Sequence, residues 1–274
     1  MPDKQLVLLA GAGQLPLEIY HHECAQGRAP VVIVGDGVTV HPVLAQKAIA
    51  RLPLGQVTQM IKVIKSAGGT DVLMVGKVDR QSLSTYQPDE QLYSAVAAIG
   101  GDTSGDDGML RAWSGCFVNA GLRLCGIQDV LPDAIMPAGV LTHKHPHVSQ
   151  TPSLERAFAV AHALGSVDVG QAVVVQDGLV LGVEALEGTD KLITRCATLL
   201  TASTIPPVLV KAAKPQQDLR LDLPALGPTT IGLLATHGYA GVALEAHKSL
   251  LIAREKSLAC ANRHNLFIMG MTVQ

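Results

Sequence analysis

The chain has 274 residues, of which 48% are hydrophobic, 16% are charged and only 3% are aromatic. This length suffices for two domains, and the aliphatic composition predicts a core of valine, leucine, isoleucine and alanine, as in α/β proteins with buried sheets. The formal net charge is −2 with acids and bases mixed, so there is no basic footprint and we expect no nucleic-acid partner.

The cysteines and the hydropathy of the chain indicate the cellular compartment in which the protein works. The five cysteines are scattered and form no CxxC pair, which predicts free thiols in a reducing compartment. The first residues lack the layout of a secretory signal, and no run of about 18 apolar residues is present that would span a membrane. These features predict a cytoplasmic protein and leave peripheral contact with a membrane surface open.

The chain begins with the pattern of strand, glycine loop, helix and strand. Residues 5–10 are a continuous apolar run typical of a buried parallel strand, and the loop Gly11-Ala12-Gly13-Gln14 leads into a predicted helix. Residues 30–35 are the next predicted strand, and Asp36 follows it where dinucleotide-binding folds place a ribose-binding acid. This βαβ beginning favours nucleotide binding at the glycine loop. Because Pro16 replaces the third glycine of the fingerprint, a simple tight turn is the alternative.

The remainder of the first domain continues the alternation of helix and strand. Residues 56–69 have helical spacing, and 70–75 read as a further strand. Lys77 and Arg80 follow that strand at its carboxyl end, where open α/β sheets place ligand contacts, so they are phosphate candidates with ordinary surface charge as the alternative. Further along, we predict a helix at 109–121, with Asp106 or Asp107 as its N-cap, and a strand at 122–127.

A proline-rich segment divides the chain. Residues 132–152 hold four prolines and little periodicity, which predicts a first domain at 1–132, a linker at 133–152 and a second domain at 153–274. The linker contains His143, His145 and His147. An HxHxH pattern binds metals in some extended segments, but the interleaved prolines favour a surface loop.

Three acids mark the first charged window of the second domain. After a predicted helix at 153–164, an Asp-Gly turn at 177–178 predicts a hairpin with arms at 172–175 and 179–185. Glu184, Glu187 and Asp190 then lie between the second arm and a helix predicted at 191–200. Such hard oxygen ligands favour Mg²⁺ or Mn²⁺, and the helix N-terminus favours a phosphate through Thr189. The alternative is one capping acid and two solvated ones.

The most charged stretch of the chain is 211–228. Lys211, Lys214, Asp218, Arg220 and Asp222 fall within twelve residues of it. If the stretch is extended, the last three share one face and the intervening leucines share the other, an arrangement suited to a metal, a phosphate or an oriented water. A solvated edge strand with a row of ion pairs is the alternative. The remaining predicted elements are strands at 208–212, 240–245, 249–252 and 266–273 and helices at 228–238 and 254–264.

Several of these segments together resemble the UDP-2,3-diacylglucosamine pyrophosphatases of lipid A synthesis, the LpxI-type family. The resemblance covers nearly the whole chain and is densest from 168 to 228. The matching motifs are GAGQLP at 11–16, GKVDR at 76–80, GDDGML at 105–110, DVGQ at 168–171, VEALEGTD at 183–190 and KPQQDLRLDLPALG at 214–227. Gln216 replaces a usual glycine and Lys191 stands where small residues are common, and the first departure implies a less flexible loop before Asp218.

The resemblance implies an α/β protein in which an N-terminal Rossmann-like parallel-sheet domain and a C-terminal mixed α/β catalytic domain face each other across a polar cleft. It also implies a homodimer. The implied activity is Mg²⁺-dependent hydrolysis of UDP-2,3-diacylglucosamine to UMP and 2,3-diacylglucosamine 1-phosphate, with water directed at the sugar-side phosphorus. Such an amphiphilic substrate places the protein in the cytoplasm, with peripheral contact at the inner face of the membrane.

Roles for individual residues follow from the motifs and their chemistry. The family's essential aspartate falls on Asp222, so the catalytic candidates are Asp222, Asp218 and Arg220. The candidates for binding Mg²⁺, or Mn²⁺ as the alternative, are Asp222, Glu184, Glu187 and Asp190. The substrate-binding candidates are Gly11, Ala12, Gln14 and Lys77 for the UMP part and Gln171, Thr189, Lys211 and Lys214 in the second domain. We expect Gly11→Val to weaken binding of UDP ligands without unfolding the protein.

Two other function classes compete with hydrolysis. A nicotinamide-dependent, NAD(P)-type oxidoreductase explains the glycine loop and Asp36, and a non-catalytic nucleotide-binding module explains the loop alone. Neither gives the acids between 184 and 222 a task.

Overall fold

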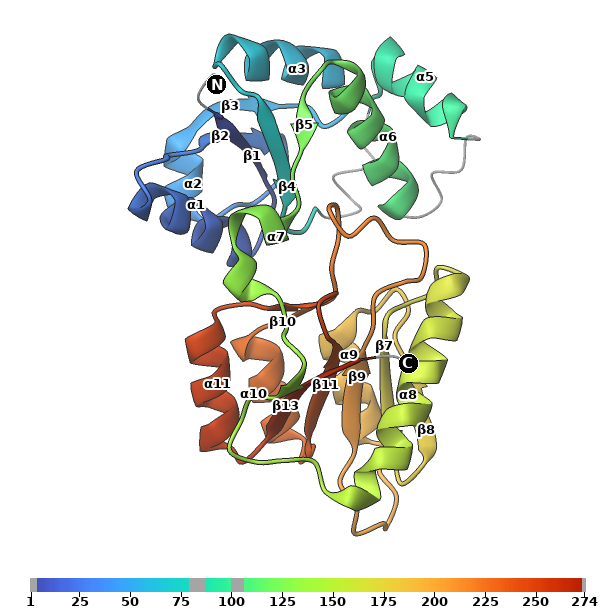
Figure 1. Ribbon diagram of the computed structural model, residues 1–274. Helices are drawn as coiled ribbons and strands as arrows, with labels where there is room; N and C mark the ends of the chain where they lie inside the picture. The colour runs from blue at the N-terminus through green and yellow to red at the C-terminus, as the bar shows by residue number, and fades with distance from the viewer. Residues whose placement is uncertain (1–3, 79–86, 100–105, 273–274) are drawn as a thin grey trace. The chain divides into compact units, whose positions relative to one another are not determined.

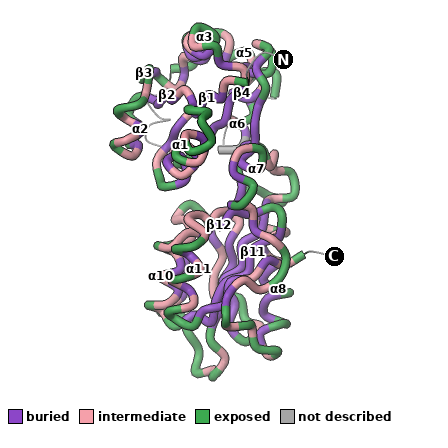
Figure 2. The backbone as a smooth tube through the Cα atoms, turned by 60° about the vertical axis from the view of Figure 1, so that its left-hand side comes forward, coloured by how far each residue is buried: buried purple, intermediate pink, exposed green. Residues whose placement is uncertain are grey.

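The computed structural model describes residues 4–78, 87–99 and 106–272, without the side chains of Asp106 and Asp107. The chain divides into two compact units, Met1–Pro132 and Asp133–Gln274. Each unit is built on its own main sheet, five-stranded in unit 1 and six-stranded in unit 2 (Figure 1). Buried residues follow the strands in both units, as the purple segments of Figure 2 show.

Unit 1 is a doubly wound parallel α/β fold. Its sheet has the order β3-β2-β1-β4-β5, and each neighbouring pair is parallel. Figure 1 shows α1 and α2 on one side of the sheet and α3, α5 and α6 on the other. The strands are β1 Leu6–Ala10, β2 Val31–Gly35, β3 Ala48–Leu52, β4 Asp71–Val75 and β5 Arg123–Leu124. The helices are α1 Leu15–Ala25, α2 Pro42–Lys47, α3 Val57–Ser66, α5 Glu90–Ala98, α6 Asp106–Asn119 and α7 Ile127–Val130. This architecture confirms the Rossmann-like parallel-sheet domain.

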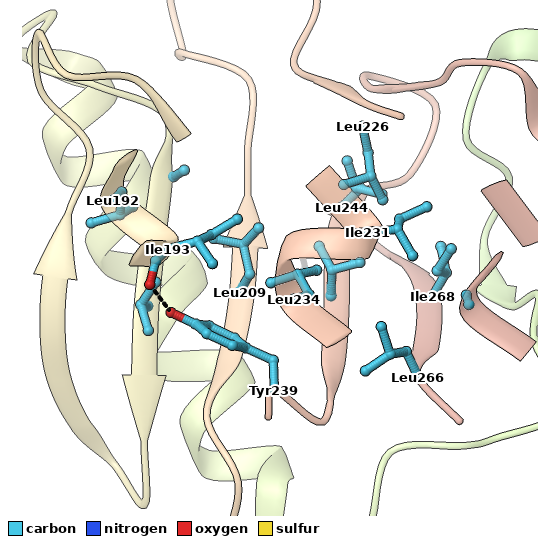
Figure 3. Close-up of a cluster of buried hydrophobic side chains, with 14 of the residues drawn as sticks. Leu192, Ile193, Leu209, Leu226, Ile231, Leu234, Tyr239, Leu244, Leu266 and Ile268 are labelled. Carbon is cyan, nitrogen blue, oxygen red and sulfur yellow. Dashed lines mark hydrogen bonds between the residues drawn. The ribbon is translucent and has the colours of Figure 1, made fainter. Parts of the chain in front are cut away.

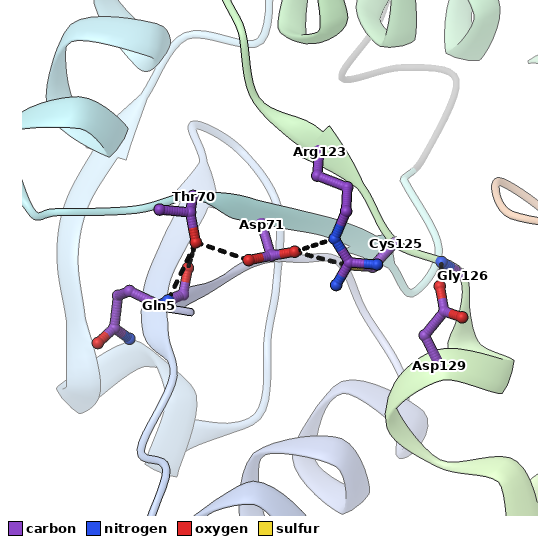
Figure 4. Close-up of polar contacts among 7 residues, drawn as sticks. All are labelled: Gln5, Thr70, Asp71, Arg123, Cys125, Gly126 and Asp129. Atoms are coloured by element: carbon purple, nitrogen blue, oxygen red, sulfur yellow. Dashed lines mark hydrogen bonds and ion pairs between the residues drawn. The ribbon is translucent and has the colours of Figure 1, made fainter. Parts of the chain in front are cut away.

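A buried carboxylate joins β4 to β5 at the amino-terminal edge of this sheet. Asp71 is 4% exposed, accepts a hydrogen bond from Thr70 Oγ1 at 2.6 Å and forms an ion pair with Arg123 (Figure 4). The Cys125 thiol also donates to it at 3.7 Å. Burial opposes ionisation of Asp71, but these hydrogen bonds outweigh burial and hold its pKa below the usual value. Burial also raises the pKa of Cys125 to about 11, so this thiol stays protonated.

Unit 2 is a mixed α/β fold, also as predicted. Its sheet has the order β6-β13-β11-β9-β7-β8, in which β9, β11 and β13 are parallel and the other pairs are antiparallel. The strands are β6 Gly139–Val140, β7 Ala172–Gln176, β8 Leu179–Val183, β9 Val208–Lys211, β11 Gly241–Glu245 and β13 Phe267–Met271, with β10 Ala225–Leu226 and β12 Leu250–Leu251 forming a small second sheet. The helices are α8 Thr151–Ser166, α9 Thr189–Ala197, α10 Pro228–Thr236 and α11 Arg254–Arg263.

The main sheet of unit 2 is covered on both faces. Side chains of α8 pack with one face, and side chains of α9, α10 and α11 pack with the other (Figure 1). The core between the sheet and α9, α10 and α11 contains Tyr239, whose hydroxyl donates to the carbonyl of Ile193 at 3.1 Å (Figure 3). Burial raises the pKa of Tyr239, which keeps this hydrogen-bond donor protonated. Each fully buried Leu or Ile side chain in such a core contributes about 1.5–3 kcal/mol.

The structure confirms the predicted hairpin turn and the predicted free cysteines. Asp177 and Gly178 have φ angles of 49° and 74°, as the predicted two-residue turn between β7 and β8 requires. All five cysteines are free thiols. Among the residues that the structure describes, none of the helices has both the length and the apolarity needed to cross a bilayer.

The segment that we predict to be a linker is part of unit 2. β6 pairs with β13, with Val140 opposite Met269 and Gly139 opposite Gly270. The Thr142 hydroxyl accepts from Ile268 N at 2.9 Å, and Met136 is fully buried. The prolines therefore interrupt an edge segment of the sheet rather than mark a solvated connection. His143, His145 and His147 are exposed within it, as a surface loop predicts.

The extended conformation considered for the charged stretch is wrong. β9 ends at Lys211, and the chain then turns at Asp218, whose carbonyl accepts from Leu221 N at 2.8 Å and from Asp222 N at 3.3 Å. The Asp218 carboxylate also accepts from Arg220 N at 3.0 Å. Such local side-chain hydrogen bonds to the backbone compete with strand formation, which explains the turn.

Candidate active site

Most of the predicted polar residues of unit 2 converge at one edge of its sheet. Lys211 ends β9 and pairs with Leu244 of β11 and Ala172 of β7, so the ends of these strands meet there. The antiparallel β8 also ends at this edge, because Glu184 N donates to Ala172 O at 2.8 Å. Gln171, Glu184, Lys211 and the following segment are therefore neighbours. Open sheets place ligand sites outside the carboxyl ends of their parallel strands, which is this edge.

Glu184 links the end of β8 to the start of α9. It is 8% exposed, accepts from the Thr189 hydroxyl at 2.7 Å and from Gln171 N at 3.3 Å. The Oε1 atom of Gln171 is itself buried and has no hydrogen-bond partner within the described residues. Gln171 thus retains an unused hydrogen-bond acceptor at this edge of the sheet, while Thr189 and Glu184 are hydrogen-bonded to each other.

The other two acids of this window are also engaged. Glu187 accepts from Arg195 at 2.7 Å, and this hydrogen bond is the main reason that the pKa of Glu187 lies below its usual value. Asp190, in the first turn of α9, accepts from the Thr230 hydroxyl of α10 at 2.8 Å. The Asp190–Thr230 hydrogen bond links the N-terminal turns of α9 and α10.

The two lysines lie in different environments. Lys211 is 5% exposed, and its Nζ donates to the carbonyl of Ala225 at 2.9 Å, which joins the two ends of segment 211–225. Lys214 forms an ion pair with Asp168, and its side chain is 19% exposed. Lys214 therefore lies nearer to solvent than Lys211 and is the better placed of the two to meet a phosphate.

The catalytic candidates occupy the turn that follows. Arg220 donates to both carboxylate oxygens of Asp218, at 3.0 and 2.7 Å, and this pairing lowers the pKa of Asp218. Asp222 accepts from the Gln217 side chain at 2.5 Å. Asp218, Arg220 and Asp222 therefore lie within one turn, and not on one face of a strand.

The acids predicted to hold Mg²⁺ do not gather into a metal-binding group. Thr189, Arg195, Thr230 and Gln217 each donate to one of the four carboxylates. Within 4–78, 87–99 and 106–272, no three His, Cys, Asp or Glu side chains come close enough to hold an ion. A site made of all four acids therefore does not fit this arrangement.

In unit 1 the glycine loop lies at the point where the strand order reverses, between β1 and β4. This switch point is where doubly wound folds bind ligands. Gly11 N donates to Val75 O at 2.7 Å, and Ala12 and Lys77 exchange two backbone hydrogen bonds of 2.7 and 2.8 Å. The predicted residues Gly11, Ala12 and Lys77 are therefore brought together, with Gln14 exposed in the adjoining turn. Asp79 and Arg80 lie outside the described residues.

The close approach of these two loops changes the role of Gly11. A Cβ atom on Gly11 would lie 2.6 Å from the Gly76 carbonyl carbon, and one on Gly76 would lie 2.7 Å from the Gly11 carbonyl carbon. The expectation that Gly11→Val leaves the fold undisturbed conflicts with this geometry, because the added side chain would force the two backbones apart.

Sequence reasoning did not name as site candidates several residues that hold this edge together, although Asp168 and Gln217 lie within the matching motifs. Glu245, Asp168 and Gln217 contact the segment 212–222 through side-chain hydrogen bonds or ion pairs. Glu245 ends an otherwise apolar strand, β11, and a charge in that position is the signal that points to it.

Comparison with known proteins agrees with this architecture. The family models described as LpxI N-terminal domain and LpxI C-terminal domain match residues 5–134 and 137–269. The chain is 34% identical to the UDP-2,3-diacylglucosamine pyrophosphatase LpxI of Caulobacter vibrioides over 277 residues, covering 99% of each. A solved structure titled CobK precorrin-6A reductase aligns with 99% of this chain and 90% of its own at 12% identity, but its TM-score of 0.31 carries no argument. The chain belongs to the LpxI family.

Proposed function

We propose that this protein hydrolyses the pyrophosphate bond of UDP-2,3-diacylglucosamine, releasing UMP and 2,3-diacylglucosamine 1-phosphate for lipid A synthesis. The observation that carries the proposal is the full-length similarity to a pyrophosphatase of that name. The location of the 168–171, 183–190 and 214–227 motifs at one sheet edge supports it.

The chemistry requires positive charge near the diphosphate and an oriented water. Cleavage develops negative charge on the leaving phosphate, which fixed cationic groups stabilise. Lys214 and Arg220 supply such groups on segment 211–225, each next to a carboxylate that holds it in place. Asp222, in the DLP motif, is our candidate for orienting and deprotonating the water. We propose that the switch-point loop of unit 1, with Gly11, Ala12, Gln14 and Lys77, holds the UMP part.

A dependence on Mg²⁺, or on Mn²⁺ in its place, is part of the proposal. Mg²⁺ keeps several waters and is commonly bound by one or two carboxylates together with substrate phosphates, rather than by a cage of protein ligands. In that mode Asp222 would be one protein ligand, and the diphosphate of the substrate and waters would supply the others.

We also propose a homodimer that contacts the inner face of the membrane peripherally. The acyl chains of the substrate support the membrane contact. Leu179 and Leu186, 58% and 79% exposed on and just after β8, are apolar side chains available for either contact.

The test of the proposed function is Asp222→Ala. We expect a folded protein that still binds the substrate but releases UMP about 10²-fold more slowly or worse, which is the usual scale of a lost acid–base group. Glu155→Gln, on the exposed side of α8, is the matched loss of a carboxylate and should retain the wild-type rate. Near-normal turnover by Asp222→Ala would remove this residue from the mechanism.

A further inference from the structure

One buried charge at the active edge has no role in the function proposed above. Glu245 ends β11 and is only 2% exposed. Its Oε2 accepts from Ala213 N at 3.0 Å, its Oε1 lies 2.8 Å from Lys248 Nζ, and His162 Nε2 lies 3.4 Å from Oε2. A buried carboxylate is costly unless it is paired and hydrogen-bonded, so its burial here depends on these partners.

The contact with Ala213 extends the sheet by one hydrogen bond. Ala212 N donates to Gln171 O of the segment leading into β7 at 3.0 Å, and the next amide, Ala213 N, donates to the Glu245 side chain on the other side. Glu245 therefore fixes the direction in which the chain leaves β9. The residues that follow are Lys214, Asp218, Arg220 and Asp222.

Further along, the segment is held by other contacts as well, and its Leu221 and Leu223 side chains are buried. Gln216 Nε2 donates to Gly165 O of α8 at 2.8 Å, and Lys214 pairs with Asp168, a partly exposed residue. The Glu245 contact joins two buried residues, since Glu245 is 2% and Ala213 is 3% exposed. Since a misplacement of about 1 Å costs about 10²-fold in rate, a buried hydrogen bond at the start of the segment bears directly on where Asp222 lies.

We propose that Glu245 is a positioning residue for the reaction, acting through its hydrogen bond to Ala213 N. The proposal rests on the proposed function, because it assigns Glu245 the task of placing Asp222. For this task Glu245 must place a hydrogen-bond acceptor within reach of Ala213 N. Its negative charge serves mainly to pair with Lys248.

Two conservative variants separate reach from charge. Glu245→Asp keeps the charge but withdraws the carboxylate from Ala213 N by one methylene. Glu245→Gln removes the charge but keeps an acceptor at the original reach. We expect Glu245→Asp to lower kcat for UMP release about tenfold with KM changed less than about twofold, and Glu245→Gln to keep kcat within about threefold of wild type.

Two further measurements exclude a merely structural effect. Hydrogen exchange of the amides at 213–222 should be faster in Glu245→Asp and unchanged in Glu245→Gln. Tyr239→Phe removes the buried hydrogen bond to Ile193 O (Figure 3). Tyr239 lies just before β11, whose other end is Glu245. This control should lower Tm and leave kcat unchanged.

The other results would overturn the proposal. These are wild-type kcat in both Glu245 variants, a greater loss in Glu245→Gln than in Glu245→Asp, equal losses in both, or a loss of kcat in Tyr239→Phe that matches its loss of Tm. Absence of UMP release by the wild-type protein would instead refute the proposed function, and the hydrogen-exchange comparison would still decide whether Glu245 orders the segment.

Discussion

At the scale of single residues, the backbone of Gly76 leaves no space for a side chain on Gly11. Because a Cβ there would lie 2.6 Å from the Gly76 carbonyl carbon, we predict that Gly11→Ala destabilises unit 1 by about 1–3 kcal/mol, as overpacking usually does. Denaturant unfolding followed by the fluorescence of Trp113 measures this, since Trp113 is the only tryptophan and lies in unit 1.

The matched control is a glycine with room for a methyl group. A Cβ on Gly115, in α6, meets no atom within 4 Å, so Gly115→Ala should leave stability unchanged or raise it by about 0.5–1 kcal/mol. Wild-type stability of Gly11→Ala would show that the two loops separate without cost, contrary to the role given to their contact.

Individual residues also show what the sequence cannot predict. The motifs identify Lys214 and Asp222 as functional candidates, because their charges are conspicuous in a chain that is only 16% charged. Their partners are harder to foresee, since Asp168 is 46 residues from Lys214 and Glu245 is 32 residues from Ala213. Such contacts depend on strand order, which no local pattern specifies.

At the scale of elements, the β4–β5 pair depends on the ionisation of Asp71. Hydrogen bonds outweigh burial and keep the folded-state pKa of Asp71 below the usual value of about 3.9. A lowered carboxyl pKa gives stability that is fully present above the unfolded-state pKa and is lost as the pH falls through the folded-state pKa. We therefore predict that unit 1 loses stability below about pH 4, where the carboxyl begins to be protonated.

Asp71→Asn tests this dependence. At pH 7 the variant should unfold about 1–3 kcal/mol more easily than wild type, because the charged hydrogen bonds to Thr70 and Arg123 are lost or weakened. The difference should shrink as the pH falls below about 4. Trp113 fluorescence again reports unit 1, and a difference that stays constant with pH would contradict the assignment to Asp71.

Elements were predictable where the apolar pattern is strong. The runs at β1, β2, β4, β9, β11 and β13 are buried parallel strands, and the alternation with helices specifies an α/β fold. α2, β3 and α5 are absent from the prediction because they are short or only partly buried. The segment 218–222 has the alternation of a strand, but Asp218 forms a turn with its own neighbours instead. Gln216, a departure from the family pattern, adds a contact to α8 that fits a stiffer loop.

At the scale of the whole molecule, the two units carry separate parts of the proposed reaction. In the proposal, the switch point of the unit 1 sheet holds the nucleotide and the charged edge of unit 2 carries the groups for hydrolysis. Family membership over nearly the whole chain confirms the resemblance on which these roles depend. The polar cleft between the domains, the homodimer and the metal ligands stay predictions.

Removing divalent metal from the protein and adding it back tests the proposed metal requirement. We predict that excess EDTA abolishes UMP release and that added Mg²⁺ restores it, with Mn²⁺ as a weaker or equal substitute, because the diphosphate needs its charge neutralised. Asp222→Ala measured alongside should not respond to added metal. Undiminished release in EDTA would leave Lys214 and Arg220 as the source of that neutralisation.

The most direct measurement is hydrolysis of UDP-2,3-diacylglucosamine by the purified protein in ¹⁸O-labelled water, with both products analysed by mass spectrometry. We predict equal amounts of UMP and 2,3-diacylglucosamine 1-phosphate, with one ¹⁸O atom in the phosphate of the sugar product. Label in UMP would contradict attack at the sugar-side phosphorus while keeping the pyrophosphatase. Release of UDP, or no product from folded protein supplied with Mg²⁺, would contradict the central claim.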